Sequence, residues 1–535
     1  MPMLFRGNAS GHDFQFHIAS WMDAAGQWRE GIVYPRWAEW ANWGFGEPRF
    51  VFYPPASWMI GAALGTLLPW AIVPGFFIWL TLVAAGMAMW RLAREWLSPR
   101  EAITAAVFFA ANPYNLLVVY YRSDFAELLA EALFPLLILG ALRVTRTGWR
   151  GVPFLGSVLA AIWLCNAPAA VIATYSLALL VVVGSALARH LRPFLAGTAA
   201  IAVGFGLAAF YILPAAFEQR WVQIAQVVSQ NLRPEHNFIF AHGGDPEFIL
   251  FNWKVSTLAL GMMLITGIFA VFVARRRRQS PDPWWMLLAI AAVSSFLMFA
   301  PSEIFWRFLP KLQFVQFPWR WLDALSVAFA FFAAAALGRS QKQWMSWLAI
   351  LAVLGATATA IASDAWWDSA DASTLADWIH SGLGYEGTDE YAPSGCDRYQ
   401  LPGVTADSED PPSQPIPQFS KVDPDSDEIV PAAGMRVHIE RWSPEQRAFS
   451  TGSAAPVELA LRLVNYPVWE ARIDGQQSTI GSRPETAQVV LAIPAGAHKI
   501  EMSFRRTPDR AAGDTISVLS ALLLIAFTRL RRGPN

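Results

Sequence analysis

Long apolar runs separated by short polar segments dominate the chain and indicate its architecture. A helix needs about 20 apolar residues to cross the hydrocarbon core of a membrane. The run 152–187 contains no charged residue and is long enough for two short spans, with Asn166 and Pro168 at the turn between them. The pattern predicts a polytopic α-helical bundle of 11 membrane helices. The other runs of spanning length lie at about 71–91, 102–121, 126–142, 193–213, 254–274, 284–300, 318–338, 344–361 and 515–530.

A shorter apolar run, 53–69, has a different character. Prolines at both ends limit it to a helix of about four turns, and Trp58 and Trp70 are residues that favour the membrane interface. We interpret this run as a re-entrant or interfacial helix, which brings the bundle to about 11–12 helices. The alternative is a full span, which would place residues 91–101 outside despite their arginines.

Basic residues cluster at the ends of the apolar runs and orient the helices, because arginine and lysine favour the cytoplasmic side of a membrane. Every interval between neighbouring clusters holds an even number of predicted crossings, so one topology satisfies all of them. The loops 214–253 and 301–317 and the segment 362–514 then lie outside. The clusters are Arg91/Arg94/Arg100, Arg143/Arg146/Arg150, Arg189/Arg192, Arg275 to Arg278, Arg339/Lys342 and Arg529/Arg531/Arg532.

The segment 362–514 has the composition of a soluble region. Residues 393–431 are rich in Pro, Asp and Ser, which predicts an irregular loop. Residues 435–442 and 456–506 alternate between apolar and polar side chains, as half-buried strands do. We therefore expect a small antiparallel β-sandwich outside the membrane. The dipeptides that signal turns within it are Asp474-Gly475 and Ala495-Gly496.

The predicted organisation has four parts. An external amphipathic loop, 1–52, precedes the transmembrane helical bundle, 53–361. The external β-rich domain, 362–514, is followed by residues 515–535, which form a last membrane helix and a basic cytoplasmic tail. The expected location is the cytoplasmic (inner) membrane, with the large C-terminal domain on its external, periplasmic side.

Composition supports a membrane protein and argues against several functions. The 535 residues are 55% hydrophobic and only 15% charged, whereas soluble domains have about 25% charged residues. The net charge of −1 gives no reason to expect nucleic-acid binding. The sequence has no phosphate-binding Gly-rich loop, no nucleophile elbow and no zinc-type Cys/His spacing. ATP-driven transport and serine hydrolysis are therefore poorly supported.

The polar stretch "GHDFQFH", residues 11–17, stands out ahead of the apolar runs. Asp13 and His17 are four residues apart and share one face if the stretch is helical, whereas His12 points elsewhere. A carboxylate and an imidazole are ligands that divalent metals accept, although two ligands do not define a metal site. The alternative is an interfacial amphipathic helix with ordinary polar caps.

The corner "YRSDFAELLAEALFP", residues 121–135, brings charges to the external end of two predicted spans. Carboxylates inside a membrane are costly and usually face a cavity. The functional interpretation is a polar wall of a substrate cavity formed by Arg122, Asp124 and Glu127, with Arg122 binding a phosphate. The alternative is a self-neutralising Arg–Glu pair that joins two helices, and for Glu131 we favour a structural role.

The segment "VQFPWRWLD", residues 315–323, places Arg320 and Asp323 just inside another span. An external arginine at head-group level could bind a lipid phosphate or diphosphate. The alternative is that Arg320 extends to the interface beside two tryptophans. The loop 214–253 adds further polar residues of low specificity, namely Glu218, His236, His242, Asp245 and Glu247.

These motifs together resemble a family. "GHDFQFH", "YRSDFAELLAEALFP", "FYILPA", "VQFPWRWLD" and "YPVWEARIDG" are similar, in this order, to bacterial 6-pyruvoyl-tetrahydropterin synthase-related membrane proteins. The architecture of that family resembles the GT-C glycosyltransferases, which use lipid-phosphate-linked sugars at the outer face of the membrane. In one respect the sequence departs from the family, because relatives usually have a membrane helix before the His-Asp stretch.

The resemblance implies a set of roles. Asp13 matches the acidic residue that GT-C enzymes carry on their first external loop, and it would accept a proton from the acceptor. Arg122 and Glu127 match an Arg-x4-Glu pattern of the family. The substrate-binding set is then His17, Arg122, Asp124, Glu127 and Arg320.

Two functions follow as expectations. The first is a GT-C-like glycosyltransferase that moves a sugar from a polyprenyl-phosphate donor to an envelope acceptor. The alternative is a non-catalytic membrane scaffold or a transporter of lipid-linked sugars in envelope biogenesis. The expected partners are membrane lipids and a polyprenyl-phosphate-linked sugar, and a divalent metal at Asp13 and His17 is the one cofactor that the residues suggest. The sequence leaves the sugar, the acceptor and the oligomeric state open.

Overall fold

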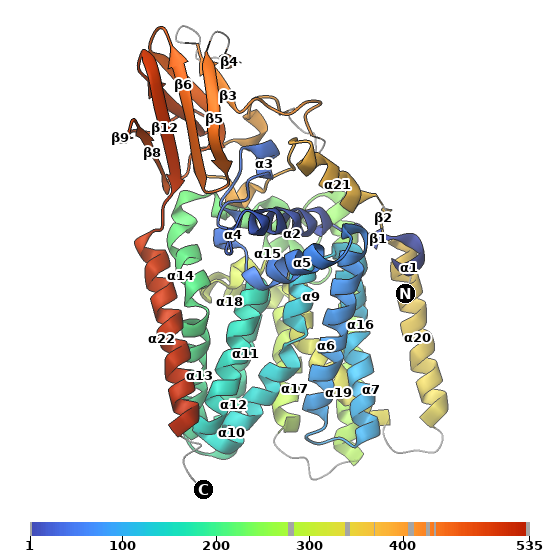
Figure 1. Ribbon diagram of the computed structural model, residues 1–535. Helices are drawn as coiled ribbons and strands as arrows, with labels where there is room; N and C mark the ends of the chain where they lie inside the picture. Colours follow the sequence, from blue (N-terminus) through green and yellow to red (C-terminus); the bar gives the residue numbers. More distant parts are fainter. Residues whose placement is uncertain are drawn as a thin grey trace.

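The computed structural model is a helical bundle that carries two antiparallel β-sheets at one end (Figure 1). This architecture confirms the predicted fold class, a polytopic helical membrane protein with a C-terminal β-rich region. The structure describes residues 3–276, 283–337, 343–368, 370–404, 411–423, 429–432 and 435–530.

Within these residues, seven helical stretches are long and apolar enough to cross a membrane. The number rises to nine if two bent helix pairs each count as one span, which is still below the 11–12 helices predicted. One reason is that Phe125–Cys165 counts as a single stretch, although α10 (Phe134–Thr147) and α11 (Val152–Cys165) are separate helices. Helix α20 (Gln343–Asp364) forms over the predicted run 344–361 and is not among the seven. The seven stretches are Trp70–Ala93, Pro99–Arg122, Phe125–Cys165, Ala167–Ala188, Pro246–Arg275, Pro318–Ala336 and Pro508–Arg529.

The turn predicted inside the run 152–187 is present. Helix α11 ends at Cys165, and Asn166 caps the first turn of α12 (Ala167–Ala188). The Asn166 side chain accepts a hydrogen bond from the backbone N–H of Ala169 at 2.9 Å. Asparagine is among the best N-cap residues because its side chain satisfies an N–H group that has no partner within the helix.

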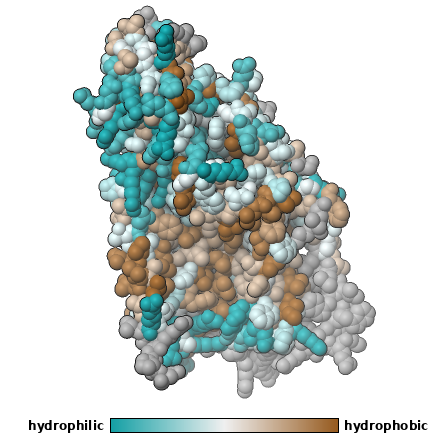
Figure 2. All heavy atoms as spheres, viewed as in Figure 1, coloured by the Kyte–Doolittle hydropathy of each residue, from teal (hydrophilic) through white to brown (hydrophobic). Residues whose placement is uncertain are grey.

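The connections that carry the basic clusters gather at one end of the bundle. Figure 1 shows that α6 (Val73–Ala93) joins α7 (Pro99–Ala110), and α12 joins α13 (Arg192–Leu207), at the end away from the sheets. The Arg146 guanidinium lies 3.4 Å from the Glu95 carboxylate, so two of the predicted clusters meet there. On the face drawn in Figure 2, apolar side chains cover the bundle between the hydrophilic sheets and a hydrophilic fringe at that far end. Part of the cluster 275–278 and the cluster Arg339/Lys342 lie outside the described residues.

The segment before residue 70 covers the other end of the bundle. Helix α2 (Phe14–Arg29) crosses this end, between the membrane helices and the sheets (Figure 1). Helix α5 (Pro55–Leu67) packs against α2 so closely that a Cβ at Gly61 would lie 2.0 Å from the Trp21 ring. With 13 residues, α5 is shorter than a membrane crossing requires, as predicted for the run 53–69.

The two sheets form the predicted β-rich region, and every strand pair in them is antiparallel. The strand orders are β10-β11-β7-β3-β4 and β5-β6-β12-β8-β9. Apolar side chains from both sheets, among them Phe449, Leu459, Leu461 and Ile500, form a shared core. The strands are β3 (Phe419–Val422), β4 (Ile429–Pro431), β5 (Arg436–Ser443), β6 (Gln446–Ser453), β7 (Val457–Val464), β8 (Trp469–Ile473), β9 (Gln476–Ser478), β10 (Gly481–Ser482), β11 (Gln488–Ile493) and β12 (Gly496–Phe504).

One detail of the sheets differs from the prediction, and both predicted turns are present. The region 393–431, predicted as an irregular loop, contributes β3 and β4, and β3 pairs with the central strand β7. Asp474-Gly475 forms the expected hairpin turn, with Ile473 opposite Gln476, whereas Ala495-Gly496 leads from β11 into β12 in the other sheet. A local turn signal identifies a change of direction, and it cannot specify which sheet the next strand joins.

A buried charge ties the sheets to the bundle. Glu218, at the end of α14 (Ala209–Glu218), accepts hydrogen bonds from Arg510 Nε at 2.7 Å and Arg510 Nη2 at 2.8 Å. Arg510 belongs to the last helix, α22 (Pro508–Leu530), and the hydroxyl of Tyr466, between β7 and β8, donates to the same carboxylate at 2.6 Å. One carboxylate therefore joins a bundle helix, the sheets and the last helix.

Candidate functional site

A cavity of about 890 Å³ lies where the bundle, the start of α2 and the segment 388–391 meet. Its wall has two parts. The polar part is formed by side chains from the start of α2 and the residues just before it, from the corner before α9 (Phe125–Glu131) and from the turn before α19 (Leu322–Leu337). The apolar part comes from α11 to α14 and from the turn at 314, and it includes Trp163, Val171, Phe205, Ile212 and Phe314.

Asp13 is held at this cavity by backbone contacts. It immediately precedes α2, yet its side chain makes no capping hydrogen bond. Its backbone N–H instead donates to the carbonyl of Arg122 at 2.8 Å. The approach depends on Gly11, because a Cβ there would lie 2.3 Å from the carbonyl oxygen of Tyr121. No other residue type fits this position without displacing the backbone.

The corner around Arg122 has an unusual backbone. Residues Val118–Arg122 form a π-helical turn, and Ser123 adopts a left-handed conformation with φ 53°. Turns of this kind are frequent at functional sites. The Ser123 hydroxyl accepts a hydrogen bond from Gly11 N–H at 3.0 Å and donates to the Ala9 carbonyl at 2.8 Å, which joins the corner to the N-terminal segment.

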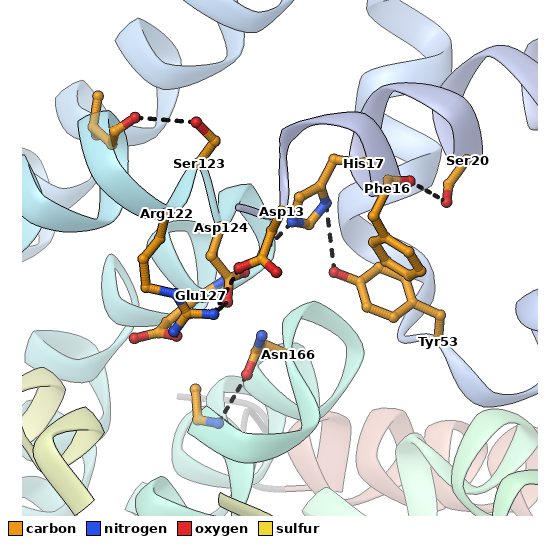
Figure 3. A network of polar contacts seen from close by, with 12 residues as sticks. Asp13, Phe16, His17, Ser20, Tyr53, Arg122, Ser123, Asp124, Glu127 and Asn166 are labelled. Carbon is orange, nitrogen blue, oxygen red and sulfur yellow. Dashed lines mark hydrogen bonds and ion pairs between the residues drawn. The ribbon is translucent and has the colours of Figure 1, made fainter. Parts of the chain in front are cut away.

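The corner turns its charges toward Asp13, as Figure 3 shows. Arg122 Nη2 lies 2.6 Å from Asp13 Oδ2 and 3.1 Å from Asp124 Oδ2. Arg122 Nη1 lies 3.1 Å from Glu127 Oε2. The Asp124 carboxylate also caps α9 by accepting a hydrogen bond from the backbone N–H of Glu127 at 2.9 Å. A single guanidinium therefore contacts three carboxylates.

Arg320 reaches the same cluster from another part of the chain. Its Nε lies 2.8 Å from Glu127 Oε2, and its Nη2 lies 3.2 Å from Asp124 Oδ2. Its Nη1 donates to the Gln316 side chain at 3.0 Å and to the Val315 carbonyl at 3.1 Å. Gln316 has φ 66° and ψ −61°, a strained γ-turn geometry that nearby contacts must maintain.

His17 contacts the charged cluster, but it does not share a ligand position with Asp13. His17 Nε2 lies 3.5 Å from Asp124 Oδ1, and its other ring nitrogen lies 3.5 Å from the Tyr53 hydroxyl. Asp13 and His17 therefore contact different partners. Among the described residues, no group of three or more His, Cys, Asp or Glu side chains has the arrangement of a metal site.

The members of the cluster differ in their access to the cavity. The Asp13 side chain is 35% exposed, whereas those of Arg122, Asp124 and Arg320 are 5–6% exposed and that of Glu127 is fully buried. Burial raises the pKa of Asp124, but the His17 hydrogen bond and the two arginines outweigh burial and hold this pKa below its usual value. Asp13 is therefore the carboxylate of the cluster that an incoming molecule meets first.

Two acids that follow the cluster in sequence lie deeper. Glu131 is buried, and Asn112 Nδ2 donates to its Oε1 at 3.4 Å. Asp323 is also buried, and neither of its carboxylate oxygens has a hydrogen-bond partner within the described part of the chain. Neither residue lines the cavity.

The polar residues of the loop 214–253 do not form a second site of their own. Glu218 is the buried partner of Arg510, and Asp245 accepts a hydrogen bond from Asn231 at 2.5 Å. The His242 ring packs against Trp253. Glu247, in contrast, lines the cavity.

Sequence reasoning missed several residues of the site. His12 was expected to point elsewhere, yet α2 begins only at Phe14, so His12 lines the same cavity and its ring packs on Phe251. Burial lowers the pKa of His12. No sequence motif indicated Tyr114 or Gln316. The Tyr114 hydroxyl donates to Glu127, and the Gln316 side chain accepts from Arg320. Their roles depend on how separate segments of the chain pack together.

One comparison identifies the chain. A family model described as "6-pyruvoyl-tetrahydropterin synthase related domain; membrane protein" matches residues 50–370. The chain belongs to this family. The match supports several membrane-spanning helices, and its range covers Arg122, Asp124, Glu127 and Arg320. A search of the curated proteins finds no significant match.

Proposed function

We propose that this 6-pyruvoyl-tetrahydropterin synthase-related protein is a GT-C-like glycosyltransferase of the bacterial inner membrane. It would transfer a sugar from a polyprenyl-phosphate donor to an envelope acceptor at the outer, periplasmic face. The observation that carries the proposal is the convergence of Asp13, Arg122 and Arg320 on one cavity at the end of the bundle that bears the sheets. Transfer by such an enzyme needs a base, cations and an apolar surface in one place.

Asp13 is the proposed general base. The acceptor hydroxyl attacks the anomeric carbon of the donor sugar, the bond from that carbon to the phosphate oxygen breaks, and the phosphate leaves with the bonding electrons. The hydroxyl proton passes to Asp13, whose Oδ2 is held by Arg122 at 2.6 Å and whose side chain is 35% exposed. Arg122, Asp124, Glu127 and Arg320 fix the position of this carboxylate, and His17 supports Asp124.

The sequence suggested that Arg122 and Arg320 contact the donor phosphate, and this proposal gives them a different role. Both guanidinium groups already bind carboxylates, so their first role is to hold the cluster together. The apolar part of the cavity is the proposed site of the polyprenyl chain, because it offers aromatic and aliphatic side chains beside the charged part. The sheets lie outside the bundle and are the proposed acceptor side.

The test compares Asp13→Asn with Asp514→Asn in a deletion strain. Asp514 is a matched control because its side chain is 38% exposed, pairs with Arg506 and belongs to the last helix. Asp13→Asn should reduce turnover about 10²- to 10⁴-fold, the usual contribution of a general base. Lipid-linked sugars and envelope glycans of the complemented strains provide the measurement.

The two variants separate the proposed function from its alternative. Asp514→Asn should restore the wild-type glycan profile, and Asp13→Asn should leave the donor unused. A fully restored profile with Asp13→Asn at wild-type protein levels would favour the alternative, a non-catalytic scaffold or a transporter of lipid-linked sugars. A self-paired cluster of charges would then serve only to hold α2 on the bundle.

A further inference from the structure

One basic side chain that lines the cavity, Lys311, lies outside the charged cluster. Three arginine or lysine side chains line the cavity within the described residues, namely Arg122, Arg320 and Lys311. Arg122 and Arg320 contact carboxylates, whereas Lys311 makes no ion pair in the described part of the chain. Its Nζ donates to the side-chain oxygen of Gln219 at 3.2 Å.

The charged cluster is a poor place for a phosphate. With every group ionised, Asp13, Asp124 and Glu127 carry three negative charges against the two positive charges of Arg122 and Arg320. A phosphate placed there would meet like charges in a poorly hydrated site, where repulsion is weakly screened. Lys311 has the charge that a phosphate needs, with no carboxylate to displace.

The backbone holds Lys311 in place. Lys311 has φ 62°, a left-handed conformation that is unusual for a residue with a side chain. The Tyr175 hydroxyl donates to the Pro310 carbonyl at 2.9 Å, and the Phe314 N–H donates to the Lys311 carbonyl at 3.1 Å. Strained residues of this kind cluster at active sites, ligand clamps and switch regions. The Lys311 Nζ lies 4.5 Å from the Phe314 ring centroid, on the apolar side of the cavity.

The surroundings of Lys311 suit an apolar chain. Ile212, Ala215 and Phe314 line the cavity next to Lys311 and Gln219. The helix pair α13–α14 bends by 73°, and the pair α17 (Pro283–Leu297) with α18 (Glu303–Phe308) bends by 97°. The Lys311–Gln219 hydrogen bond links the segments that follow these two bends. Ile304 and Phe308 on α18 are exposed, as expected for side chains that face lipid.

We infer that Lys311, with Gln219, binds the phosphate of a lipid phosphate whose apolar chain lies along Ile212, Ala215 and Phe314. This assignment rests on the proposed function, because it takes a lipid phosphate as the donor. It places the phosphate opposite the carboxylate cluster, so the sugar lies between Lys311 and Asp13. Lys311 then stabilises the negative charge that develops on the leaving phosphate.

The test measures binding of farnesyl phosphate and of farnesol to the full-length protein in maltoside micelles, where the probe carries the only phosphate. The variants are Lys311→Met and Lys311→Arg. Lys254→Met is the matched control, because Lys254 is a half-exposed lysine that pairs with Asp364 outside the cavity. Lys311→Met should weaken farnesyl phosphate binding about 10- to 100-fold and leave farnesol binding unchanged. Lys311→Arg and Lys254→Met should bind as the wild type does.

Each failure has a distinct meaning. Wild-type affinity of Lys311→Met for farnesyl phosphate would overturn the assignment of Lys311 and leave the proposed function standing. If the wild-type protein binds farnesol as tightly as farnesyl phosphate, the lipid-phosphate donor itself is wrong. Equal weakening by Lys254→Met would show a general effect of surface charge and would also overturn the assignment. If the wild-type protein binds inorganic phosphate and Lys311→Met does not, the result would support the contact between Lys311 and phosphate, but not the site of the lipid's apolar chain.

Discussion

The position of Asp13 depends on one glycine. The N-terminal segment approaches the corner 121–123 through backbone hydrogen bonds, so the carboxylate meets Arg122 without any help from helix capping. The sequence suggested Arg122 and Arg320 as site residues because charges inside or beside apolar runs are costly. It suggested Asp13 mainly through the resemblance to the family. It could not show that Asp13 and Arg122, 109 residues apart, touch.

Gly11→Ala should disrupt the site, whereas Gly26→Ala should not. A Cβ at Gly11 would clash with the Tyr121 carbonyl, and the backbone shift should cost about 1–3 kcal/mol. Gly26 lies within α2 with no atom within 4 Å of its Cβ, so alanine there should stabilise the helix by about 0.5–1 kcal/mol. Thermal unfolding in detergent and the complementation assay measure both effects. Equal stability and activity of the two variants would contradict this account of Asp13.

The buried residue Asp23 should make stability depend on pH. Burial raises the pKa of Asp23 to about 6, although hydrogen bonds from Gln27 and Tyr385 counter part of the rise. The folded protein then binds a proton more tightly than the unfolded chain, whose Asp has a pKa of 3.8. The stabilisation is fully present below pH 3.8 and is lost as the pH rises through about 6.

The measurement is the unfolding midpoint of the wild type and of Asp23→Asn between about pH 4 and pH 7. The wild type should lose stability over this range, by about 2 kcal/mol from this group alone. Asp23→Asn cannot titrate, so its midpoint should lack this component of the slope. Parallel curves for the two proteins would show that Asp23 does not titrate in this range.

Elements defined by local signals were predicted well, and elements defined by partners were not. The break at Asn166 was visible because an N-cap and a proline act within one turn of the helix. Strand β3 was missed because it lies in a Pro/Asp/Ser-rich region and forms by pairing with β7. The turn at Ala495-Gly496 was predicted, but the sheet that the next strand joins was not, since pairing with a partner strand decides it.

The short helix α4 (Arg49–Phe52) is held by an ion pair that gave no sequence signal. Arg49 Nε lies 2.7 Å from Glu47 Oε1, and both side chains are buried. The second oxygen of Glu47 accepts a hydrogen bond from the Thr388 N–H at 3.0 Å, which fastens the cavity segment 388–391 to the N-terminal part.

Glu47→Ala should therefore destabilise the protein strongly. It leaves the buried Arg49 charge without its carboxylate, a change that typically costs about 3–5 kcal/mol. Glu470→Ala provides the control, because Glu470 forms an exposed pair with Arg505 at 3.1 Å, and loss of such a pair costs about 0–1 kcal/mol. Chemical unfolding of both variants in detergent compares them. Similar losses would show that the Glu47–Arg49 pair behaves as a surface contact.

At the scale of the whole molecule, the two ends of the helical bundle differ in character. The sheets and α2 occupy one end of the bundle, and the connections with basic residues occupy the other (Figure 1). The charged cavity lies at the end of the sheets, where the start of α2 meets the bundle. The buried contact between Glu218 of α14 and Arg510 of α22 holds the sheets at their end of the bundle. Function is then expected at the boundary between the sheets and the membrane, where a lipid-borne donor and a water-borne acceptor can meet.

Membrane topology tests this arrangement of the two ends, because the positive-inside rule assigns the basic end to the cytoplasm. Reporter fusions after residues 230, 310 and 450 should read external, and fusions after residues 147, 277 and 341 should read cytoplasmic. Among the described residues, position 147 gives the clearest test of the cytoplasmic end. Helix α10 ends there, and Arg146 contacts Glu95 of the neighbouring connection. Position 450 lies in β6 and reports the side of the sheets. If the fusions after 147 and 450 report the same side, the bundle cannot separate its basic end from the cavity, and the proposed external site is wrong. If they report opposite sides with the sheets in the cytoplasm, the cavity faces the cytoplasm and a periplasmic acceptor is excluded.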